Sequence, residues 1–396
     1  MKVAMVHTPL IGRGGGERQF LKLSIELQKL GHEVEVFVNA VDKKACYPDM
    51  LDKVKANVIP HPLVRFKPLY TKVAKKRLPY YDATLPRMFN IARNIPSGFE
   101  IVNNHNFPTE WAAFFAKKRL RIPAVWMCNE PPFWFWQKED IKKRSRINWP
   151  LCEFFDRISA KNMDAIAVLS RIAQKLVKKV YDIPSIVVRS GVDVEMLRSA
   201  RGEEMRKTHG LEKDFLLLHV GNISSRGRQN DSIKALHYLS KTHDNVKLVI
   251  DGSGSRDALI QLSEKLKVRK KVLFLHSDSD EELAEVYAAC DLFVFPSQIT
   301  WGLAVVEAMA AGKPVIVSQE AGASEIIQNG VNGIIVENEK PEEIADRADL
   351  LMNDRKLRER MGETAQEYVT KNLSWEKYAR TMESIFQRAI LDHGKG

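Results

Sequence analysis

Short apolar runs alternate with amphipathic segments from one end of the chain to the other. The run Lys2–Val6 precedes a glycine-rich loop at Gly12–Gly16, and apolar residues then recur at helical spacing between Glu17 and Leu30. Runs of about four to eight residues that are rich in β-branched and aromatic side chains favour strands, whereas apolar positions three and four residues apart favour helices. This alternation predicts an α/β protein with doubly wound parallel sheets.

Two series of predicted strands divide the chain. The first series comprises Lys2–Val6, Glu33–Val38, Ile101–Asn103, Ala124–Met127, Ala165–Leu169 and Ile186–Val188. The second comprises Leu216–Val220, Lys247–Asp251, Val272–Leu275, Leu292–Phe295, Pro314–Val317 and Gly333–Val336. We therefore predict two Rossmann-like domains, over 1–195 and 196–375, joined near the loop-like segment Ser190–Asp193. A last amphipathic helix is predicted over about 376–396.

Positive charge is concentrated in the first half of the chain. The formal net charge is +11; residues 1–195 hold 33 lysines and arginines against 19 acidic residues, and the remainder holds 28 against 31. Clusters such as Lys72–Arg77 and Lys142–Arg146 suit an anionic lipid surface, a phosphorylated acceptor or nucleic acid, and an ordinary solvated surface would look the same. No aromatic–basic module of a known nucleic-acid-binding type is present, so we expect no nucleic-acid partner.

The cysteines and the lengths of the apolar runs bear on the compartment. Cys46, Cys128, Cys152 and Cys290 are far apart and form no metal-binding or disulfide pattern, which is typical of a reducing compartment. No stretch approaches the roughly 18 apolar residues that a spanning helix needs. We expect a cytoplasmic protein, with peripheral attachment to the inner membrane face as an additional option.

The first chemical signal is the segment Gly12–Arg18, which reads GRGGGER between the first strand and the first helix. Glycines let backbone N–H groups approach a phosphate closely, and a helix N-terminus favours negative charge. The segment is not a P-loop, because no Gly-Lys-Ser/Thr follows, and it lacks the spacing of dinucleotide-binding loops. A merely tight turn is an equally good interpretation.

A second signal follows the second-series strand that ends in Phe-Pro-Ser. Gly302 stands where a helix begins, so its amide and that of Leu303 can point at a diphosphate. Glu307 lies one helical turn further on, where a carboxylate can accept hydrogen bonds from ribose hydroxyls. The alternative is that Glu307 is a charge on the helix surface, although the mostly small residues of Ala308–Gly312 favour close packing.

These motifs, in this order, are similar to those of the retaining glycosyltransferases of family 4, which have the GT-B fold. The likeness covers nearly the whole chain and rests on five segments: Gly14–Arg18, Asn103–Pro108, Ser190–Asp193, Leu275–Ser297 and Asn329–Gly333. The resemblance implies two Rossmann-like domains that face a central cleft, with the C-terminal helix over about 376–396 crossing back to the first domain. It also implies a nucleotide-sugar donor and a glycan or lipid-linked acceptor as partners.

Residue roles follow from the resemblance by position. His105 would lie beside the transferred sugar as the catalytic residue and would hydrogen-bond a sugar hydroxyl or the leaving phosphate, with a pKa near neutrality. The alternative is a structural histidine with a backbone partner. The implied donor-binding residues are Gly15, Gly16, Asn222, Arg226, Arg228, His276, Ser277, Trp301, Gly302, Leu303 and Glu307. The implied acceptor-side residues are Glu17, Arg18, Asn129 and Glu130, and the last two open an aromatic stretch that ends at Trp136.

Two positions depart from the family pattern. Ile299 replaces the first glutamate of the usual Glu-x7-Glu pair, which contacts the donor sugar, so the sugar selectivity stays open. The usual Gly-Arg-x4-Lys-Gly stretch reads GNISSRGR from Gly221, which leaves Arg226 and Arg228 as candidates for the diphosphate. Which of the two points inward does not follow from the sequence.

The predicted activity is transfer of a hexosyl group, with retention of configuration, from a nucleoside diphosphate sugar. We expect backbone amides and an arginine, rather than a metal or cofactor, to stabilise the diphosphate, because no clustered carboxylates suggest a bound divalent ion. The Gly-Gly-x-Glu-Arg loop resembles that of mannosyltransferases of lipid-linked glycan assembly, which favours GDP-mannose and a lipid-linked acceptor. Two alternatives stay open: a sugar-nucleotide 2-epimerase on the same fold, and a degenerate nucleotide-binding regulatory subunit.

Overall fold

The computed structural model describes residues 1–60, 84–132 and 149–395, and the chain forms two compact units. Unit 1 comprises Met1–Ser190 together with Trp375–Gly396, and unit 2 comprises Gly191–Ser374. This division lies a few residues before the predicted boundary at 195/196. The reason is that the short helix α9 (Val194–Ser199) packs against two helices of unit 2, α13 (Asp280–Ala289) and α14 (Leu303–Ala310).

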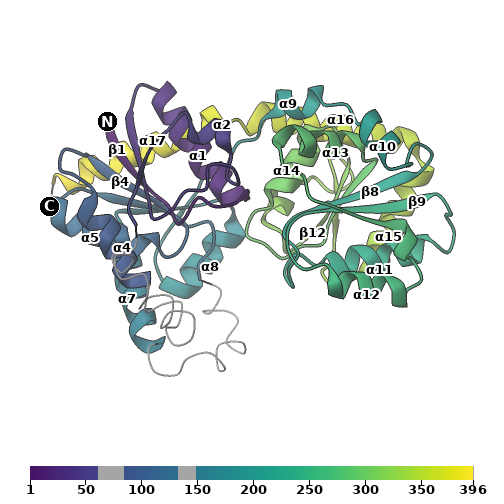
Figure 1. Cartoon of the computed structure of the whole chain (residues 1–396), viewed down its shortest axis with the longest axis horizontal. Coiled ribbons are helices and arrows are strands. Elements are labelled where there is room, and N and C mark those ends of the chain that lie inside the picture. The colour runs from purple at the N-terminus through teal and green to yellow at the C-terminus, as the bar shows by residue number, and fades with distance from the viewer. Residues whose placement is uncertain (61–83, 133–148, 396) are drawn as a thin grey trace. The chain divides into compact units, whose positions relative to one another are not determined.

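Unit 1 is built on a seven-stranded parallel sheet with the spatial order β3-β2-β1-β4-β5-β6-β7 (Figure 1). Its strands are β1 (Lys2–Val6), β2 (Glu33–Val38), β3 (Lys55–Val58), β4 (Ile101–His105), β5 (Ala124–Met127), β6 (Ala165–Val168) and β7 (Ile186–Val187). Its described helices are α1 (Gly15–Lys29), α2 (Pro48–Leu51), α4 (Thr84–Asn94), α5 (Thr109–Leu120), α7 (Trp149–Lys161), α8 (Arg171–Tyr181) and α17 (Trp375–His393).

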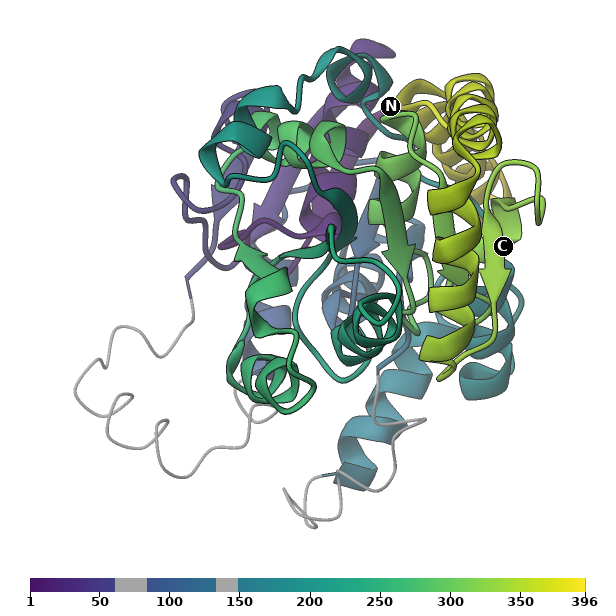
Figure 2. The same ribbon diagram turned by 90° about the vertical axis from the view of Figure 1, so that its right-hand side faces the viewer.

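Unit 2 is built on a six-stranded parallel sheet with the order β10-β9-β8-β11-β12-β13, and helices cover both of its faces (Figure 2). Its strands are β8 (Phe215–Val220), β9 (Val246–Asp251), β10 (Val272–Leu275), β11 (Leu292–Phe295), β12 (Val315–Ser318) and β13 (Ile334–Val336). Its helices are α9, α10 (Glu203–Thr208), α11 (Gln229–Leu239), α12 (Asp257–Lys265), α13 (Asp280–Ala289), α14 (Leu303–Ala310), α15 (Pro341–Asn353) and α16 (Arg355–Asn372), with short 3-10 turns at Arg269–Lys271 and Gly322–Ile326.

The predicted fold class is confirmed, since both units are doubly wound α/β structures with parallel sheets. Every predicted strand is present to within two residues at either end. The edge strand β3 was missed, because Lys55 and Asn57 interrupt its apolar pattern and its side chains are half-buried or exposed. No helix within the described ranges is long and apolar enough to cross a membrane.

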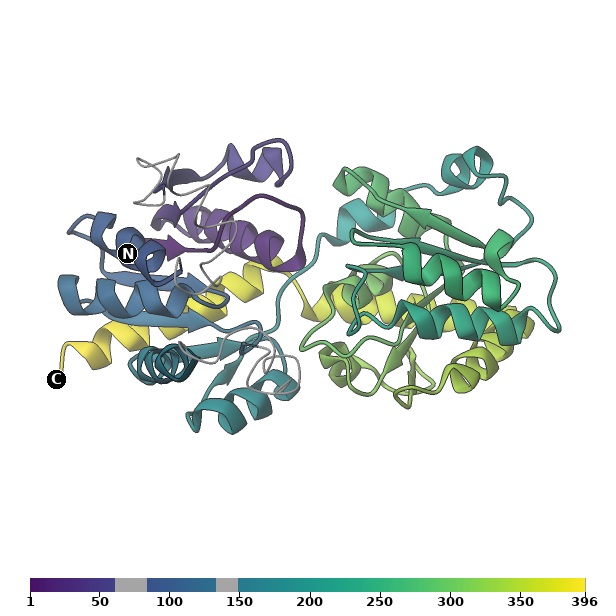
Figure 3. The ribbon, with the colours of Figure 1, turned by 60° about the horizontal axis from the view of Figure 1, so that its bottom comes forward.

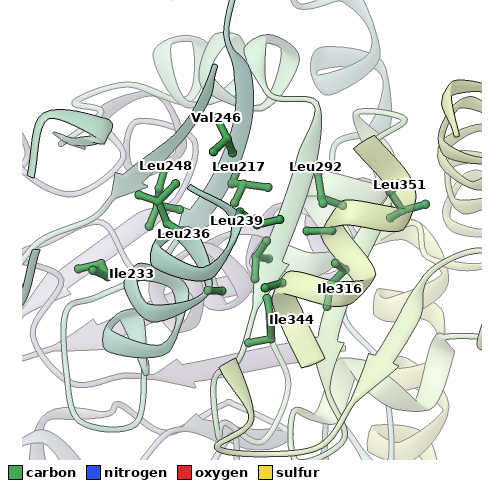
Figure 4. Close-up of a cluster of buried hydrophobic side chains, with 14 of the residues drawn as sticks. Leu217, Ile233, Leu236, Leu239, Val246, Leu248, Leu292, Ile316, Ile344 and Leu351 are labelled. Atoms are coloured by element: carbon green, nitrogen blue, oxygen red, sulfur yellow. The ribbon is translucent and has the colours of Figure 1, made fainter. Parts of the chain in front are cut away.

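The core of unit 2 lies between its central strands and two helices (Figure 4). Leu217 and Leu248, from β8 and β9, pack with Leu236 of α11, and Ile344 and Leu351 of α15 complete the same cluster. All five side chains are at most 1% exposed. Burial of this kind stabilises unit 2 by roughly 1.5–3 kcal/mol per large side chain.

The last helix, α17, packs on unit 1, as predicted (Figure 3). Its buried residues face α1 and β5. Gln19 Nε2 donates a hydrogen bond of 2.7 Å to the hydroxyl of Tyr378, and His32 Nε2 lies 2.7 Å from Glu383 Oε1. The first helix of the chain is therefore covered by the last one.

Candidate active site

In both sheets the chain order reverses at one point. β1 lies between β2 and β4 in unit 1, and β8 lies between β9 and β11 in unit 2. Loops that leave the carboxyl ends of two such neighbouring strands diverge to opposite faces of the sheet, and doubly wound folds bind ligands in the crevice between them. The residues after β1, β4, β8 and β11 are therefore the candidates in each unit.

The glycine loop after β1 is shaped by close approaches. Gly14 precedes α1, and a Cβ there would lie 2.4 Å from Oε2 of Glu17, whose side chain folds back over the helix N-terminus. A Cβ on Gly16 would lie 2.9 Å from Nδ2 of Asn106. Burial raises the pKa of the Glu17 carboxyl. Gly15 and Gly16 belong to the first turn of α1, where amides lack intrahelical partners and can bind an anion.

Arg13 and Arg18 gather around Tyr47, beside the glycine loop. Arg18 is 5% exposed, and its Nε lies 3.4 Å from the Tyr47 hydroxyl, which donates a hydrogen bond of 3.2 Å to the Gly14 carbonyl. The guanidinium carbons of Arg13 and Arg18 lie 4.5 and 5.3 Å from the centroid of the Tyr47 ring. Two guanidinium groups thus lie on one ring beside the glycine loop, and guanidinium groups can bind a carboxylate or phosphate.

A chain of hydrogen bonds crosses the reversal point of unit 1. Asn129 Nδ2 donates to Asn106 Oδ1 at 2.7 Å, Asn106 Nδ2 donates to His7 Nε2 at 3.0 Å, and His7 Nδ1 donates to the carbonyl of Thr8 at 3.0 Å. These bonds require a neutral His7 with its proton on Nδ1, and burial lowers its pKa to about 4. Sequence reasoning missed His7, although its place directly after β1 could have revealed it.

His105, the predicted catalytic residue, ends β4 and is fully buried. Its Nε2 lies 2.9 Å from Oδ1 of Asn103, and its ring centroid lies 5.1 Å from that of Phe20 and 6.5 Å from that of His7. Burial, with His7 beside it, holds the pKa of His105 well below its usual value. The expected pKa near neutrality is therefore wrong. The partner of Nε2 is a side chain and not the backbone group that the structural alternative required.

Two acidic side chains are buried together in unit 1, on the helices that follow this site. Glu110 lies in the first turn of α5, and Asp156 of α7 accepts a hydrogen bond of 2.9 Å from the hydroxyl of Tyr181. Burial and the nearby Asp156 raise the pKa of Glu110 well above its usual value, and burial raises that of Asp156 to about 6. The pair therefore retains a proton at pH values where exposed carboxyls are ionised.

In unit 2 the loop Gly221–Arg228 follows β8 and lies against the loop after β9. A Cβ on Gly252 would lie 2.1 Å from the carbonyl oxygen of Gly221, so only glycine permits this approach. Asn222 Oδ1 accepts a hydrogen bond of 2.7 Å from Ser253, which fixes the predicted donor-binding amide between the two loops.

Arg226 and Arg228 differ in their surroundings. Arg226 donates from Nε and Nη2 to the carbonyl of Gln298, at 3.1 and 2.7 Å, and so contacts the segment that leads into α14. Arg228 precedes α11 and pairs with the carboxylates of Asp231 and Glu339. The charge of Arg228 is thus balanced within unit 2 by two carboxylates.

The predicted helix start at Gly302 is confirmed. Gly302 has φ of 109° and precedes Leu303, the first residue of α14. A Cβ there would lie 3.0 Å from the ring of Phe295, so both the conformation and the packing favour glycine. Trp301 is 5% exposed, and its carbonyl accepts a hydrogen bond of 2.7 Å from the amide of Ala323. The loop before α14 is thus fixed by packing on Phe295 and by the hydrogen bond from Ala323.

Glu307 lies inside unit 2 and not on the helix surface. It is 5% exposed, and its Oε2 accepts a hydrogen bond of 2.9 Å from the hydroxyl of Tyr287 on α13. Tyr287 is 20 positions away in sequence, and no pattern in the sequence links the two residues.

The loop after β10 carries the two residues that the resemblance assigns to the nucleobase. His276 is exposed, with Nε2 3.7 Å from Asp278 Oδ1. Ser277 donates from Oγ to Asp251 Oδ2 at 2.6 Å and from its amide to Oδ1 at 3.3 Å. Asp251 ends β9 and is 4% exposed, so a buried carboxylate that sequence reasoning missed holds this loop in place.

Contrary to the expectation of no clustered carboxylates, two acidic residues stand close together at α13. Asp278-Ser279-Asp280 forms an Asp-x-Asp triplet at the start of α13, with Asp278 exposed. Within the described part of the chain, no group of three or more His, Cys, Asp or Glu side chains could hold a metal ion.

Three of the predicted features lie outside the described residues. They are the basic cluster Lys72–Arg77 and the aromatic stretch Phe133–Trp136, together with Lys142–Arg146 beyond it. Asn129 and Glu130, which open that stretch, are half-buried directly after β5.

Each half of the chain matches a glycosyltransferase family. Residues 13–196 match the family described as Glycosyltransferase Family 4, and residues 201–368 match the one described as Glycosyl transferases group 1. Together the two matches span most of both units.

Similar proteins point the same way. An uncharacterised glycosyltransferase of Methanocaldococcus jannaschii is 36% identical over 47% of this chain and 48% of its own length. The N-acetyl-alpha-D-glucosaminyl L-malate synthase of Bacillus anthracis is 25% identical over 100% of this chain and 99% of its own. The crystal structure of Anabaena HepE in complex with UDP-glucose has a TM-score of 0.76 at 18% identity, over 98% of this chain and 100% of that one; this likeness concerns the fold.

Proposed function

We propose that this chain, a glycosyltransferase of the family 4 type with the GT-B fold, transfers a hexose from a nucleoside diphosphate sugar to an acceptor that carries a negative charge. One observation carries the donor half of the proposal. The loop that holds Arg226 and the segment that leads to Gly302 are hydrogen-bonded to each other at the reversal point of the unit 2 sheet. An arginine and a helix N-terminus thus lie where doubly wound sheets bind nucleotides.

The chemistry of the leaving group follows from these residues. As the bond between sugar and diphosphate breaks, negative charge grows on the leaving oxygen. Arg226 and the amides at Gly302 and Leu303 stabilise that charge, so that a metal ion is not required. Glu307 accepts hydrogen bonds from the ribose hydroxyls. The configuration at the transferred carbon is retained, an assignment that rests on the sequence resemblance.

The donor is proposed to be GDP-mannose, because the glycine loop Gly14–Arg18 resembles that of mannosyltransferases. Ile299 cannot accept a hydrogen bond from a sugar hydroxyl, so sugar selection must come from other groups. Gln298, whose carbonyl is bonded to Arg226, and Thr300 are the neighbouring polar side chains.

The acceptor is proposed to carry a carboxylate or phosphate that contacts Arg18 and Arg13 at the edge of the glycine loop. The product for which the Bacillus relative is named contains malate, a dicarboxylate, which supports an anionic acceptor. A lipid-linked glycan bears a phosphate as well, and it would bring the basic half of the chain to an anionic membrane surface.

A thermal-shift screen tests the proposal. UDP, GDP and ADP, with and without an attached hexose, are added to the whole chain, and a ligand at 100 times its dissociation constant stabilises by about 2.7 kcal/mol. We expect the largest shift with GDP-mannose, and slow release of GDP from it when no acceptor is present. A shift with UDP-glucose alone would overturn the choice of donor. No shift with any nucleotide would overturn the proposed function, and binding without any turnover would favour a regulatory subunit.

A further inference from the structure

Asn103 and His105 project to the same side of β4. They are two residues apart on a strand, and successive side chains of a strand point to opposite faces. Both are fully buried, and Asn103 Oδ1 lies 2.9 Å from His105 Nε2. The two residues therefore form a pair within unit 1.

The orientation of the Asn103 amide is fixed by the neighbouring strand. Its Nδ2 donates a hydrogen bond of 2.8 Å to the carbonyl of Val125 on β5. Since the NH₂ group is used there, the oxygen faces His105. An amide oxygen only accepts, so His105 Nε2 must carry the proton.

The other ring nitrogen, Nδ1, is consequently unprotonated and carries a lone pair. His105 Nδ1 is buried and has no hydrogen-bond partner within the described residues. The rings of Phe20 and His7 pack around the imidazole, with centroids 5.1 and 6.5 Å away. His7 is itself neutral, because Asn106 donates to its Nε2. A buried acceptor without a donor costs free energy, and a substrate hydroxyl would remove that cost.

We propose that Asn103 is a positioning residue: it holds His105 as the neutral tautomer with the proton on Nε2, so that Nδ1 accepts a hydrogen bond from a hydroxyl of the bound sugar. The proposal rests on the proposed function for the identity of the ligand. It assigns His105 the role of a fixed acceptor and excludes a role as a general acid, since a general acid must hold an exchangeable proton towards the substrate.

The side chain at position 103 therefore determines the protonation state of His105. A carboxylate at this position would favour the imidazolium, because a nearby negative charge stabilises the protonated form. Nδ1 would then carry a proton and could no longer accept. His7 is the titratable side chain that packs on His105. Since two adjacent imidazolium ions would repel each other, His7 lowers the pKa of His105 further and favours its neutral state in the natural protein.

The tautomer can be read directly by nuclear magnetic resonance of the whole chain labelled with ¹⁵N-histidine, with His105→Gln used to assign the resonance. We expect a protonated Nε2 and an unprotonated Nδ1 at pH 7, and a change in the Nδ1 shift when the sugar nucleotide binds. A proton on Nδ1 would overturn the proposal. This readout does not depend on activity, so it tests whether Asn103 fixes the tautomer of His105 even if no transfer is found.

Kinetics of Asn103→Asp give a second test. We expect kcat at pH 6 to fall about tenfold, the effect of one lost hydrogen bond, to recover as the pH rises, and the donor KM to change less. The matched control is Asn332→Asp in unit 2, since Asn332 is also buried and donates to a backbone carbonyl. The control should keep the pH profile of the natural protein. An unchanged pH profile in a folded Asn103→Asp protein would overturn the proposal.

Discussion

The hydroxyl of Tyr287 donates a hydrogen bond of 2.9 Å to the carboxylate of Glu307, and both side chains are buried in unit 2. A carboxylate has about four acceptor sites. The bond from Tyr287 occupies one of them and orients Glu307, which is proposed to bind the ribose hydroxyls of the donor. The tyrosine comes from α13 and the glutamate from α14, so this orientation depends on how two helices pack.

Replacing Glu307 by Ala should weaken donor binding. A charged hydrogen bond is worth roughly 1.5–3 kcal/mol, so the dissociation constant should rise by about one to two orders of magnitude. Titration calorimetry with the nucleoside diphosphate measures the change. Tyr287→Phe should weaken binding less, and Glu285→Ala, an exposed glutamate on the same helix as Tyr287, should not weaken it at all. Equal affinity of the folded Glu307→Ala protein and its parent would remove Glu307 from the site.

Replacing His105 by Ala should lower turnover more than donor affinity. His105 ends β4 in unit 1, whereas Arg226, Gly302 and Glu307, which are proposed to hold the nucleotide, belong to unit 2. We therefore expect the lost contact to concern the reacting sugar. Steady-state kinetics with saturating donor separate the two effects, and His209→Ala, at an exposed position, is the control. Turnover within about twofold of the parent would make His105 a structural residue.

Strand positions followed from the sequence, because buried parallel strands need unbroken apolar runs. Val272–Leu275 and Ala124–Met127 are found as predicted, whereas β3 lies at a sheet edge and carries no such run. Gly302 was recognisable as well, since a helix start after a strand leaves a local signature. The partner of Glu307 and the different surroundings of Arg226 and Arg228 were not recognisable, because both depend on contacts between elements distant in sequence. The low pKa of His105 likewise comes from burial against Phe20 and His7, which no local pattern encodes.

The acidic pair Glu110–Asp156 should make stability fall as the pH rises. Because the pKa of both carboxyls is raised in the folded chain, the folded state binds more protons than the unfolded state between the ordinary carboxyl pKa and the raised values. For Asp156 this window runs from about pH 4 to about pH 6. His7 acts in the opposite sense, since its lowered pKa costs stability as the pH falls from about 6.5 to about 4.

Asp156→Asn separates these contributions. Urea unfolding measures the free energy of unfolding at pH 4.5 and 7.5. Relative to the parent, that of the variant should rise by on the order of 1–3 kcal/mol between the two pH values. Asp49→Asn, at an exposed position in unit 1, should show no such difference. A variant whose stability runs parallel to that of the parent at both pH values would argue against a retained proton.

Chelation should leave transfer largely intact. Arginine and backbone amides are proposed to neutralise the diphosphate, so EDTA should change the rate by less than about twofold. The measurement is donor consumption before and after dialysis against EDTA, with Mg²⁺ added back as the control. Complete loss that Mg²⁺ restores would point to the triplet Asp278–Asp280 as a cation site that depends on bound donor.

Attachment to membranes should depend on charge. Each lysine or arginine near an anionic bilayer contributes about 1 kcal/mol, screened beyond a Debye length of about 10 Å at 0.1 M salt. Co-sedimentation should therefore occur with anionic vesicles, weaken with salt and fail with neutral vesicles. Charge reversal at Lys75, Lys76 and Arg77, which lie outside the described residues, should reduce it. Reversal at the exposed Lys265, Lys267 and Lys270 of unit 2 should not. Equal, negligible sedimentation with both lipids would favour a soluble acceptor.

The return of α17 to unit 1 has a consequence for synthesis on the ribosome. Tyr378, which binds Gln19 in α1, is translated more than 350 residues after it. Translation adds about 5–20 residues per second, so α1 is made tens of seconds before the helix that covers it. Unit 2 is contiguous and can close while the last helix is still in the exit tunnel. The unit whose synthesis begins first is therefore the one that finishes folding last, and a nascent chain stopped at Ser374 would expose the face of α1 that α17 covers.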